Sequence, residues 1–314
     1  AVSTHPDTEP KAIFVSALRD MPLQSDFLIE VGDESRMKDF QTGLTALSKI
    51  AKVYLGIGSV QSGSVLSEMK DVEIYEFNGP CPVGNVGVQI NHISPVNKGE
   101  VVWTVDPTFV IFFGRLFNTG KVNLLRTIAL GGSAMASPMY VDALIGTPFS
   151  VILKDALTRQ EDLRLINGNP LTGTKSCLED SVGVKTSEIT AIPEGADTNE
   201  MFGWIMPRTN QFSTSRSYFS WLMGKKAYDL DARVKGGERH IIMSGEYDSV
   251  LPMDIYGEFL IKAIIVGDID KMEQLGIYEV SPEDFALAEF VDSSKLELQR
   301  IVRQGLNMLR KENA

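Results

Sequence analysis

The feature that most constrains the fold is an alternation of strand-like and helix-like patterns through about residue 120. Residues 12–18 (AIFVSAL) form a short apolar run typical of a buried strand. After Asp33 the apolar residues recur at spacings of three and four, which predicts an amphipathic helix: Met37, Phe40, Leu44, Leu47 and Ala51. The same order then continues with a strand at 53–56, a strand at 72–77, a helix from Asn85 and a strand at 101–105. This alternation predicts an α/β domain with a largely parallel sheet.

Between Leu124 and Gly195 the pattern changes to short strand-like runs separated by turn residues. The runs are LLRTIAL, MYVDAL, LRLI and VGVKTSEITAI, and the segments between them contain GG, GTP, NGNP and PEG. One helix is predicted at Phe149–Leu157. The composition of this stretch indicates a small α+β domain.

From Leu251 onwards the pattern is helical. One predicted helix has an apolar face made of Ile255, Phe259, Leu260, Ala263 and Ile264. Another has an apolar face made of Leu298, Ile301, Val302, Gly305, Leu306 and Leu309. Two helix starts are predicted, one at Ser281-Pro282-Glu283-Asp284 and one at a capping box of Ser294 and Glu297. A C-terminal helical bundle follows from these signals.

Composition narrows the class of protein. A chain of 314 residues with 43% apolar and 23% charged residues is an ordinary globular protein of two or three domains. Its net charge of -11 argues against a nucleic-acid surface or a polybasic lipid patch, so proteins or small molecules are the expected partners. Two isolated cysteines, Cys81 and Cys177, form neither a disulfide framework nor a four-thiolate metal site, which indicates a reducing compartment.

Targeting and membrane signals are weak. The longest uncharged span, Thr127 to Val141, is interrupted by glycines, serines and a proline and is shorter than the roughly 20 apolar residues of a spanning helix. The start, AVSTHPDTEP, has neither a basic region nor an apolar region, so no signal peptide is predicted. Because the sequence starts at Ala1, this stretch is interpreted as a linker exposed by truncation.

Neither glycine-rich segment fits a phosphate-binding fingerprint. In residues 75–93 (YEFNGPCPVGNVGVQINHI) the glycines Gly79, Gly84 and Gly87 do not give G-x-G-x-x-G, and Asn85 stands where a Walker loop has lysine. Gly56-Ile57-Gly58 follows a strand, but Gln61 stands at the third glycine position. Both segments are interpreted as turns.

Catalytic and metal sites lack complete motifs. Cys81 lies between two prolines with no basic neighbour that would lower its pKa, so a small side chain in a rigid turn is expected. The three histidines, His5, His92 and His240, have no metal-ligand spacing, and Gly131-Gly132-Ser133-Ala134-Met135 is no nucleophile elbow. Gly267-Asp268-Ile269-Asp270 lacks the glycine and glutamate of a calcium loop and is interpreted as one helix end followed by a new helix cap. No catalytic, cofactor-binding, metal-binding or substrate-binding residue is therefore predicted.

An aromatic and basic segment, FGWIMPRTNQFSTSRSYFSWLMGKK, occupies residues 202–226. It contains Trp204, Arg208, Phe212, Arg216, Tyr218, Phe219 and Trp221. Aromatic and arginine side chains are enriched at protein interfaces, whereas the same aromatic residues also fill cores. The sequence leaves both interpretations open.

Five blocks in order resemble the A subunit of the bacterial sodium-translocating NADH:quinone oxidoreductase. They are FNGPCPVGNVG (77–87), VVWTVDPTFVIFFGRLFNTG (101–120), LINGNPLTGTK (165–175), MFGWIMPRTNQFSTSRS (201–217) and MSGEYDSVLPMDIYGEFLIKAIIVGDIDKMEQLGIYEVSPEDFALAEFV (243–291). The resemblance spans essentially the whole chain. It implies a C-terminal fragment, because family members carry a further N-terminal barrel-sandwich domain.

The resemblance implies a fold like that of the flavin subunit of respiratory complex I. The expected parts are a Rossmann-like α/β domain at 1–120, a β-grasp soluble-ligand-binding (SLBB) domain at 121–200, an aromatic and basic connecting segment at 201–250 and a helical domain at 251–314. In relatives, cysteines near the equivalent of ALAEFVDSS hold an iron–sulfur cluster. Ala288 and Asp292 stand at those places here, and since thiolates hold such clusters, no cluster is expected.

The implied function is that of a peripheral subunit of a sodium-pumping respiratory NADH:quinone reductase, with a structural and docking role and a contribution to quinone binding. No cofactor is expected on this chain, because the flavins and the iron–sulfur centre of the complex belong to sister subunits. The implied partners are other subunits, especially the membrane subunits, and quinone (ubiquinone among the types), but no nucleic acid. The implied location is the cytoplasmic face of the bacterial inner membrane. Two alternatives stay open: a flavin- or NADH-binding redox subunit, and a small-ligand module that holds quinone.

Overall fold

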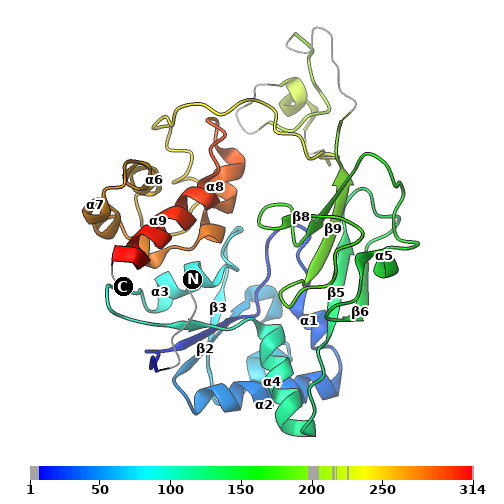
Figure 1. The fold of residues 1–314 in the computed structure, drawn as a ribbon, viewed down its shortest axis with the longest axis vertical. Coiled ribbons are helices and arrows are strands. Elements are labelled where there is room, and N and C mark those ends of the chain that lie inside the picture. The colour runs from blue at the N-terminus through cyan, green and yellow to red at the C-terminus, as the bar shows by residue number, and fades with distance from the viewer. Residues whose placement is uncertain (1–6, 197–204, 214–215, 217, 225, 313–314) are drawn as a thin grey trace. The chain divides into compact units, whose positions relative to one another are not determined.

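The structure is a computed structural model that describes residues 7–196, 205–213, 216, 218–224 and 226–312 (Figure 1). The chain forms two compact units. The first consists of Ala1–Arg126 and Glu238–Ala314, and the second of Thr127–Gly237. The chain thus leaves the first unit, builds the second and returns to complete the first.

A parallel sheet of four strands lies at the centre of the first unit, in the order β3-β2-β1-β4. The strands are β1 (Ile13–Ser16), β2 (Val53–Gly58), β3 (Glu73–Phe77) and β4 (Trp103–Thr104). The connections hold α1 (Phe27–Glu30), α2 (Glu34–Ser48), η1 (Ser59–Gln61), η2 (Val65–Glu68), α3 (Val86–Ile93) and, after β4, α4 (Pro107–Thr119). The predicted alternation of strands and helices is confirmed.

Helices cover both faces of this sheet, which is why β1 reads as a continuous apolar run. Ile13 and Val15 point to the face covered by α2 and α4. Ala12 and Phe14 point to the opposite face, where they pack against Ile90 of α3. Successive side chains of a strand alternate between faces, so one short run fills two cores.

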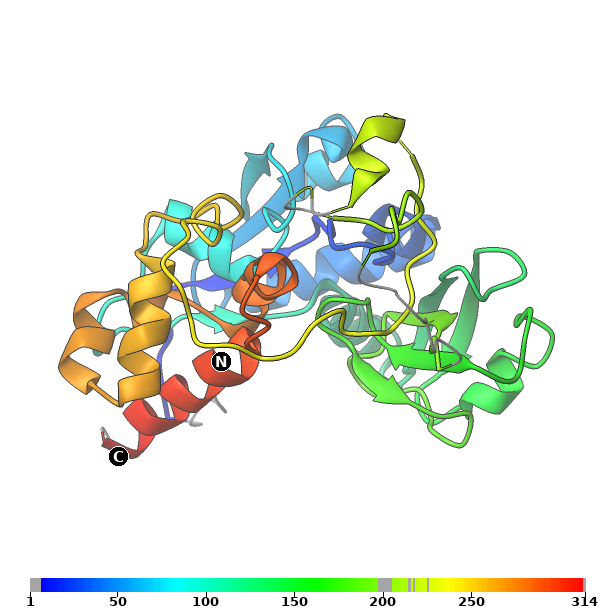
Figure 2. The same ribbon diagram turned by 90° about the horizontal axis from the view of Figure 1, so that it is seen from above.

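The C-terminal helices pack on the outer side of α3. They are α6 (Gly257–Val266), α7 (Ile269–Gln274), η4 (Ile277–Glu279), η5 (Pro282–Phe285), α8 (Ala286–Val291) and α9 (Leu298–Glu312). Val88 of α3 is fully buried in the same cluster as Leu260, Phe285 and Val302. The helical part and the α/β part therefore share one unit, with α3 buried on two sides (Figure 2).

The second unit contains a sheet of five strands in the order β6-β5-β9-β7-β8. They are β5 (Leu125–Gly131), β6 (Met139–Leu144), β7 (Leu163–Asn167), β8 (Thr174–Ser176) and β9 (Glu188–Pro193), accompanied by α5 (Phe149–Ile152) and later by η3 (Phe219–Met223). Strand β9 runs parallel to β5 and antiparallel to β7. The expected mixture of a parallel sheet, a second sheet and C-terminal helices is thus confirmed.

Three local predictions need correction. The helix predicted at Phe149–Leu157 ends at Ile152, after which Leu153 N donates back to Phe149 O and the chain turns. The capping box of Ser294 and Glu297 is wrong: α9 begins only at Leu298, Ser294 Oγ donates to His240 O at 3.0 Å, and Gln299 N donates to Glu289 Oε2 at 2.8 Å. The carboxylate of a neighbouring helix thus takes the place of the predicted cap. Helix α4 had not been predicted.

Candidate functional site

The carboxyl edge of the parallel sheet is the first place to look for a ligand. The strand order places a topological switch point between β1 and β4, because the chain runs outward from β1 to β3 and then crosses to the other side. In open α/β sheets, ligands bind outside the carboxyl ends of the strands at such a point. Here that edge is formed by residues 17–26, after β1, and by the start of α4.

Arg19 fills this edge with a buried network. Its Nη1 donates to Ser25 Oγ at 2.6 Å and to Glu30 Oε2 at 3.2 Å, and its Nη2 donates to Thr108 Oγ1 at 3.1 Å. Thr108 Oγ1 in turn donates to Glu30 Oε2 at 3.0 Å. The side chains of Arg19 and Glu30 are 6% and 4% exposed, so the pair is shielded from water. Burial raises the pKa of Glu30, and the charge of Arg19 opposes that shift.

Aspartate caps close three helix N-termini of the α/β part. Asp26 accepts from Leu28 N at 2.9 Å, Asp33 from Arg36 N at 2.7 Å and Asp106 from Thr108 N at 2.8 Å. Phosphate sites at helix N-termini need free N–H groups and the positive end of the helix dipole. A carboxylate at each of α1, α2 and α4 uses those donors and adds negative charge. These residues do not fit the phosphates of a nucleotide or a flavin.

The Gly56-Ile57-Gly58 turn is also filled by the chain itself. Gln61 Oε1 accepts from Gly58 N at 2.9 Å, and Gln61 Nε2 donates to Ala17 O at 3.0 Å. A Cβ atom at Gly56 would lie 2.0 Å from Oε1 of Gln89. The close approach that requires glycine is thus to a glutamine of α3, in agreement with the interpretation as a turn.

The segment NGPCPVG packs against the loop that follows β1. Cys81 Sγ lies 3.5 Å from Met21 Sδ. Burial, and then the nearby carboxylate of Asp20, raise the pKa of the Cys81 thiol to about 12. Burial also raises the pKa of Asp20, against the effect of the backbone amides of Gly84 and Val83. A nucleophilic cysteine needs a lowered pKa, so the prediction of an unactivated thiol is confirmed.

The start of α3 is closed by a carboxyl group from the C-terminal helices. Asn85 Nδ2 donates to Asp284 Oδ1 at 3.0 Å and to Glu283 O at 3.1 Å. A Cβ atom at Gly87 would lie 2.4 Å from Asp284 Oδ2, so only glycine leaves room for the carboxyl group. Sequence reasoning missed this contact, because its partners are 199 positions apart and belong to no motif.

The other candidate ligands are dispersed. His5 lies outside the described residues, His92 Nδ1 lies 3.0 Å from Val88 O within its own helix, and Cys177 is exposed. A hydrogen bond with Glu179 raises the pKa of Cys177. Over the described part of the chain, no three His, Cys, Asp or Glu side chains gather as a metal ion would require.

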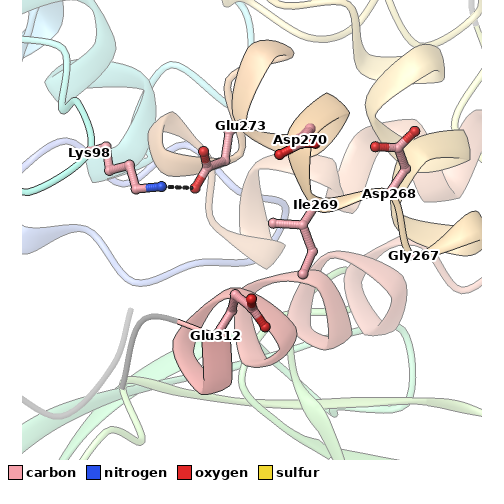
Figure 3. A pocket seen from close by; sticks show the side chains of 7 residues that line it. All are labelled: Lys98, Gly267, Asp268, Ile269, Asp270, Glu273 and Glu312. Atoms are coloured by element: carbon pink, nitrogen blue, oxygen red, sulfur yellow. Dashed lines mark hydrogen bonds and ion pairs between the residues drawn. The ribbon is translucent and has the colours of Figure 1, made fainter.

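Gly267 and Asp268 act as predicted, as a helix end and a helix start. Gly267 ends α6 with φ at 78°, and Asp268 accepts from Lys271 N at 3.1 Å at the start of α7. A hollow of about 450 Å³ lies beside them (Figure 3). Its lining residues are Lys98, Gly267, Asp268, Ile269, Asp270, Glu273 and Glu312, and Lys98 Nζ pairs with Glu273 at 2.7 Å. This acidic lining suits neither a nucleotide nor a quinone ring.

Ala288 and Asp292, at the positions where relatives are expected to carry cysteines, have structural roles. Ala288 is 1% exposed within the helical core. The carboxylate of Asp292 accepts from Ser294 N at 3.0 Å and from Leu296 N at 2.8 Å, which holds the turn before α9. Neither side chain offers a thiolate.

The aromatic and basic segment is exposed. Phe219, Trp221, Leu222 and Met223 of η3 are 57%, 51%, 63% and 56% exposed. Arg216 lies over the ring of Trp221 with 5.7 Å between guanidinium carbon and ring centroid, and Arg208 lies over Tyr218 at 5.6 Å. Of the two interpretations, the core segment is wrong for these residues, while Trp204 lies outside the described residues. Across the described residues, no helix combines the length and apolar character needed to cross a membrane.

Comparison with known proteins gives two matching family models. The model described as the NqrA second alpha/beta domain matches residues 1–122, and the SLBB model described as the NQRA C-terminal domain matches residues 127–177. Similar proteins, each named as the A subunit of a Na(+)-translocating NADH-quinone reductase, occur in Neisseria meningitidis serogroup A and Haemophilus influenzae. The first is 35% identical over 308 residues, which cover 98% of this chain and 68% of the relative. The second is 33% identical over 309 residues, with the same shares covered. The chain belongs to this NqrA family.

Membership of the NqrA family confirms several expectations. The chain is related to subunits of an oxidoreductase complex, and its partners are other subunits of such a complex. The expected SLBB domain is present, since the family model begins at residue 127, in β5.

Proposed function

We propose that the chain is a docking subunit of a Na⁺-translocating NADH:quinone reductase and holds no redox centre of its own. In this proposal its sheets have Rossmann-like and β-grasp architectures, as in the flavin subunit of complex I, but the nucleotide position has been filled. The flavins and the iron–sulfur centre lie on sister subunits. The chain is peripheral, at the cytoplasmic face of the inner membrane, and its partners include the membrane subunits.

The observation that carries this proposal is the closed carboxyl edge between β1 and β4. Arg19, Glu30 and Thr108 are hydrogen-bonded to one another where a nucleotide would lie. Separating Arg19 from Glu30 to admit a ligand would leave buried charges uncompensated, which costs about 3–5 kcal/mol for a buried ion pair. A ligand would have to supply that free energy in addition to binding.

The alternative is a redox subunit that binds flavin or NADH. It predicts free N–H groups at the helix that follows β1, whereas Asp26 already accepts from Leu28 N there. A contribution to quinone binding stays a prediction to which no residue is assigned.

Spectroscopy and co-purification test the proposal together. The chain, purified without added cofactor, is expected to lack flavin and cluster absorbance and to give no heat on titration with NADH or FMN. Stoichiometric flavin, or saturable NADH binding, would instead support the redox subunit. Full-length protein tagged in native membranes is expected to co-purify with Na⁺-dependent NADH:quinone reductase activity, and its separation from that activity would contradict the docking role.

A further inference from the structure

The aromatic and basic segment differs in charge from the rest of the chain. No Asp or Glu occurs between Met201 and Lys226, while Arg208, Arg216, Lys225 and Lys226 add positive charge. The whole chain has a net charge of -11, so this stretch is a local exception to the charge that argued against lipid binding. A surface of this sign attracts anionic groups over about a Debye length, roughly 10 Å at 0.1 M salt.

The same segment exposes consecutive apolar side chains at η3. Of the five residues from Phe219 to Met223, only Ser220 is buried, and the other four are more than half exposed. Ile205 and Met206 of the same segment are also 66% and 56% exposed. Irregular chain follows η3 as far as Tyr256, so the apolar residues stand on a short protruding turn and not on a regular helix face (Figure 1).

From these features we infer that η3 and its flanking basic residues insert into the headgroup region of an anionic lipid bilayer. Trp, Phe and Leu side chains partition into the boundary between headgroups and acyl chains, and lysine or arginine beside them pairs with anionic headgroups. Protein interfaces are depleted of lysine, whereas Lys225 and Lys226 follow the apolar turn directly. The guanidinium of Arg216, over the Trp221 ring, places positive charge at the edge of the apolar tip.

The inference rests on the proposed function, since it supplies a membrane contact for a peripheral subunit. It adds that part of this contact is made to lipid and not to protein. The two can be separated, because vesicles contain no sister subunits and detergent-solubilised subunits contain no bilayer.

Vesicle binding tests the inference with the full chain. Vesicles of phosphatidylcholine alone are compared with an equal mixture of phosphatidylcholine and phosphatidylglycerol, at low and high salt. Binding is expected for the anionic vesicles only, to weaken with salt, and to shift tryptophan fluorescence to shorter wavelength. The shift is assigned with Trp221→Ser, because Trp103 and Trp204 stay in place in that variant.

Paired substitutions identify the residues responsible. Trp221→Ser with Leu222→Ser is expected to weaken binding by more than about tenfold, because the apolar tip is lost. Arg216→Gln with Lys226→Gln is expected to weaken it by about fivefold for each charge removed. The matched controls in the same unit are Leu144→Ser with Val151→Ser, both exposed apolar residues, and Lys154→Gln; these are expected to leave binding unchanged.

Three outcomes would overturn the inference: no binding to anionic vesicles at low salt, equal binding by the η3 variants, or loss of association with detergent-solubilised sister subunits by variants that never bound lipid. The last outcome would assign the segment to a protein partner. If vesicle binding fails while co-purification with the reductase persists, only the lipid inference falls. If vesicle binding holds while co-purification fails, the docking role falls instead.

Discussion

At the scale of single residues, carboxyl groups mark the places where segments of the first unit are joined. Asp284 is the most buried of these junctions, at 1% exposed. Its Oδ2 accepts from Ser281 N and Ser281 Oγ, both at 2.8 Å, and its Oδ1 accepts from Asn85. Burial raises its pKa to about 6, with a smaller contribution from the charge of Glu283, although its hydrogen bonds oppose the shift.

The raised pKa of Asp284 predicts a pH-dependent stability. The folded state favours the protonated carboxyl group, so its contribution is complete below the ordinary pKa of 3.8 and is lost as the pH rises through about 6. A shift of about two units corresponds to about 3 kcal/mol. The free energy of unfolding of the native chain, measured relative to Asp284→Asn by urea denaturation, is expected to fall by about this amount from about pH 4 to pH 7.

The comparison with Asp284→Asn removes the effect of the other carboxyl groups, which titrate in both proteins. Asp254→Asn, at an exposed carboxyl group, is the matched control and is expected to give no such difference. A difference between native chain and Asp284→Asn that is independent of pH would contradict the assignment.

Sequence reasoning at this scale identified residues without motif chemistry but missed residues with structural chemistry. The unactivated state of Cys81 followed from its two proline neighbours and the lack of a nearby base. The pairs Arg19–Glu30 and Asn85–Asp284 could not be predicted, because local spacing says nothing about contacts between distant segments. The aspartate caps could have been found, since Asp26, Asp33 and Asp106 each precede a helix.

At the scale of elements, α2 and α4 cross with their backbones in contact. A Cβ atom at Gly114 would lie 1.6 Å from the carbonyl oxygen of Asp39, and one at Gly43 would lie 2.1 Å from that of Val110. Beside this crossing Arg115 Nε bonds Asp39 Oδ2 at 3.3 Å. Small residues at both positions allow the two helices to form one close layer under the sheet.

Gly114→Ala is expected to destabilise the chain by about 1–3 kcal/mol or more, because the added methyl group meets backbone that can yield only if the helices separate. Alanine has the higher intrinsic helix propensity, so a local helix effect would have the opposite sign. Urea denaturation measures the change. Phe117→Ala, at an exposed position of the same helix, is the control and is expected to change stability by less than about 0.5 kcal/mol. A more stable Gly114→Ala variant would show that the helices are not in contact.

The predictability of the elements depended on their periodicity. Helix α2 was predicted because its apolar residues recur on one face and Asp33 precedes it. Helix α4 was missed because PTFVIFFGRLF is apolar on nearly all sides, where periodicity fails to distinguish helix from strand. Its end signals were present all the same: Asp106 and Pro107 at the start and Gly120, with φ at 68°, at the end.

At the scale of the whole molecule, the two units have separate hydrophobic cores. Leu260 belongs to the core that joins α3 to the C-terminal helices, and Leu130 belongs to the core of the second unit. The alternation of sequence texture predicted a change of architecture after residue 120, but not that residues 238–314 return to the first unit. Periodicity reports which face of an element is apolar and not which partner covers it.

Hydrogen exchange is expected to follow this division. Leu260→Ala removes a fully buried side chain and is expected to cost about 2–5 kcal/mol. Because Val88 lies in the same core, the amides of α3 are expected to exchange faster in this variant, while those of β5 and β9 keep their native rates. Leu130→Ala is expected to give the reverse pattern. Faster exchange in both units from either substitution would contradict separate cores.

The burial of α3 on two sides has a consequence for synthesis on the ribosome. The sheet-facing side of α3 can pack as soon as β1 to β4 have emerged, but its other side, with Val88, is covered only by helices that begin at Gly257. The whole second unit is translated in between. A nascent chain therefore exposes an apolar stripe on α3 for the time that this unit takes to emerge, and that interval is when chaperones would have the most to protect.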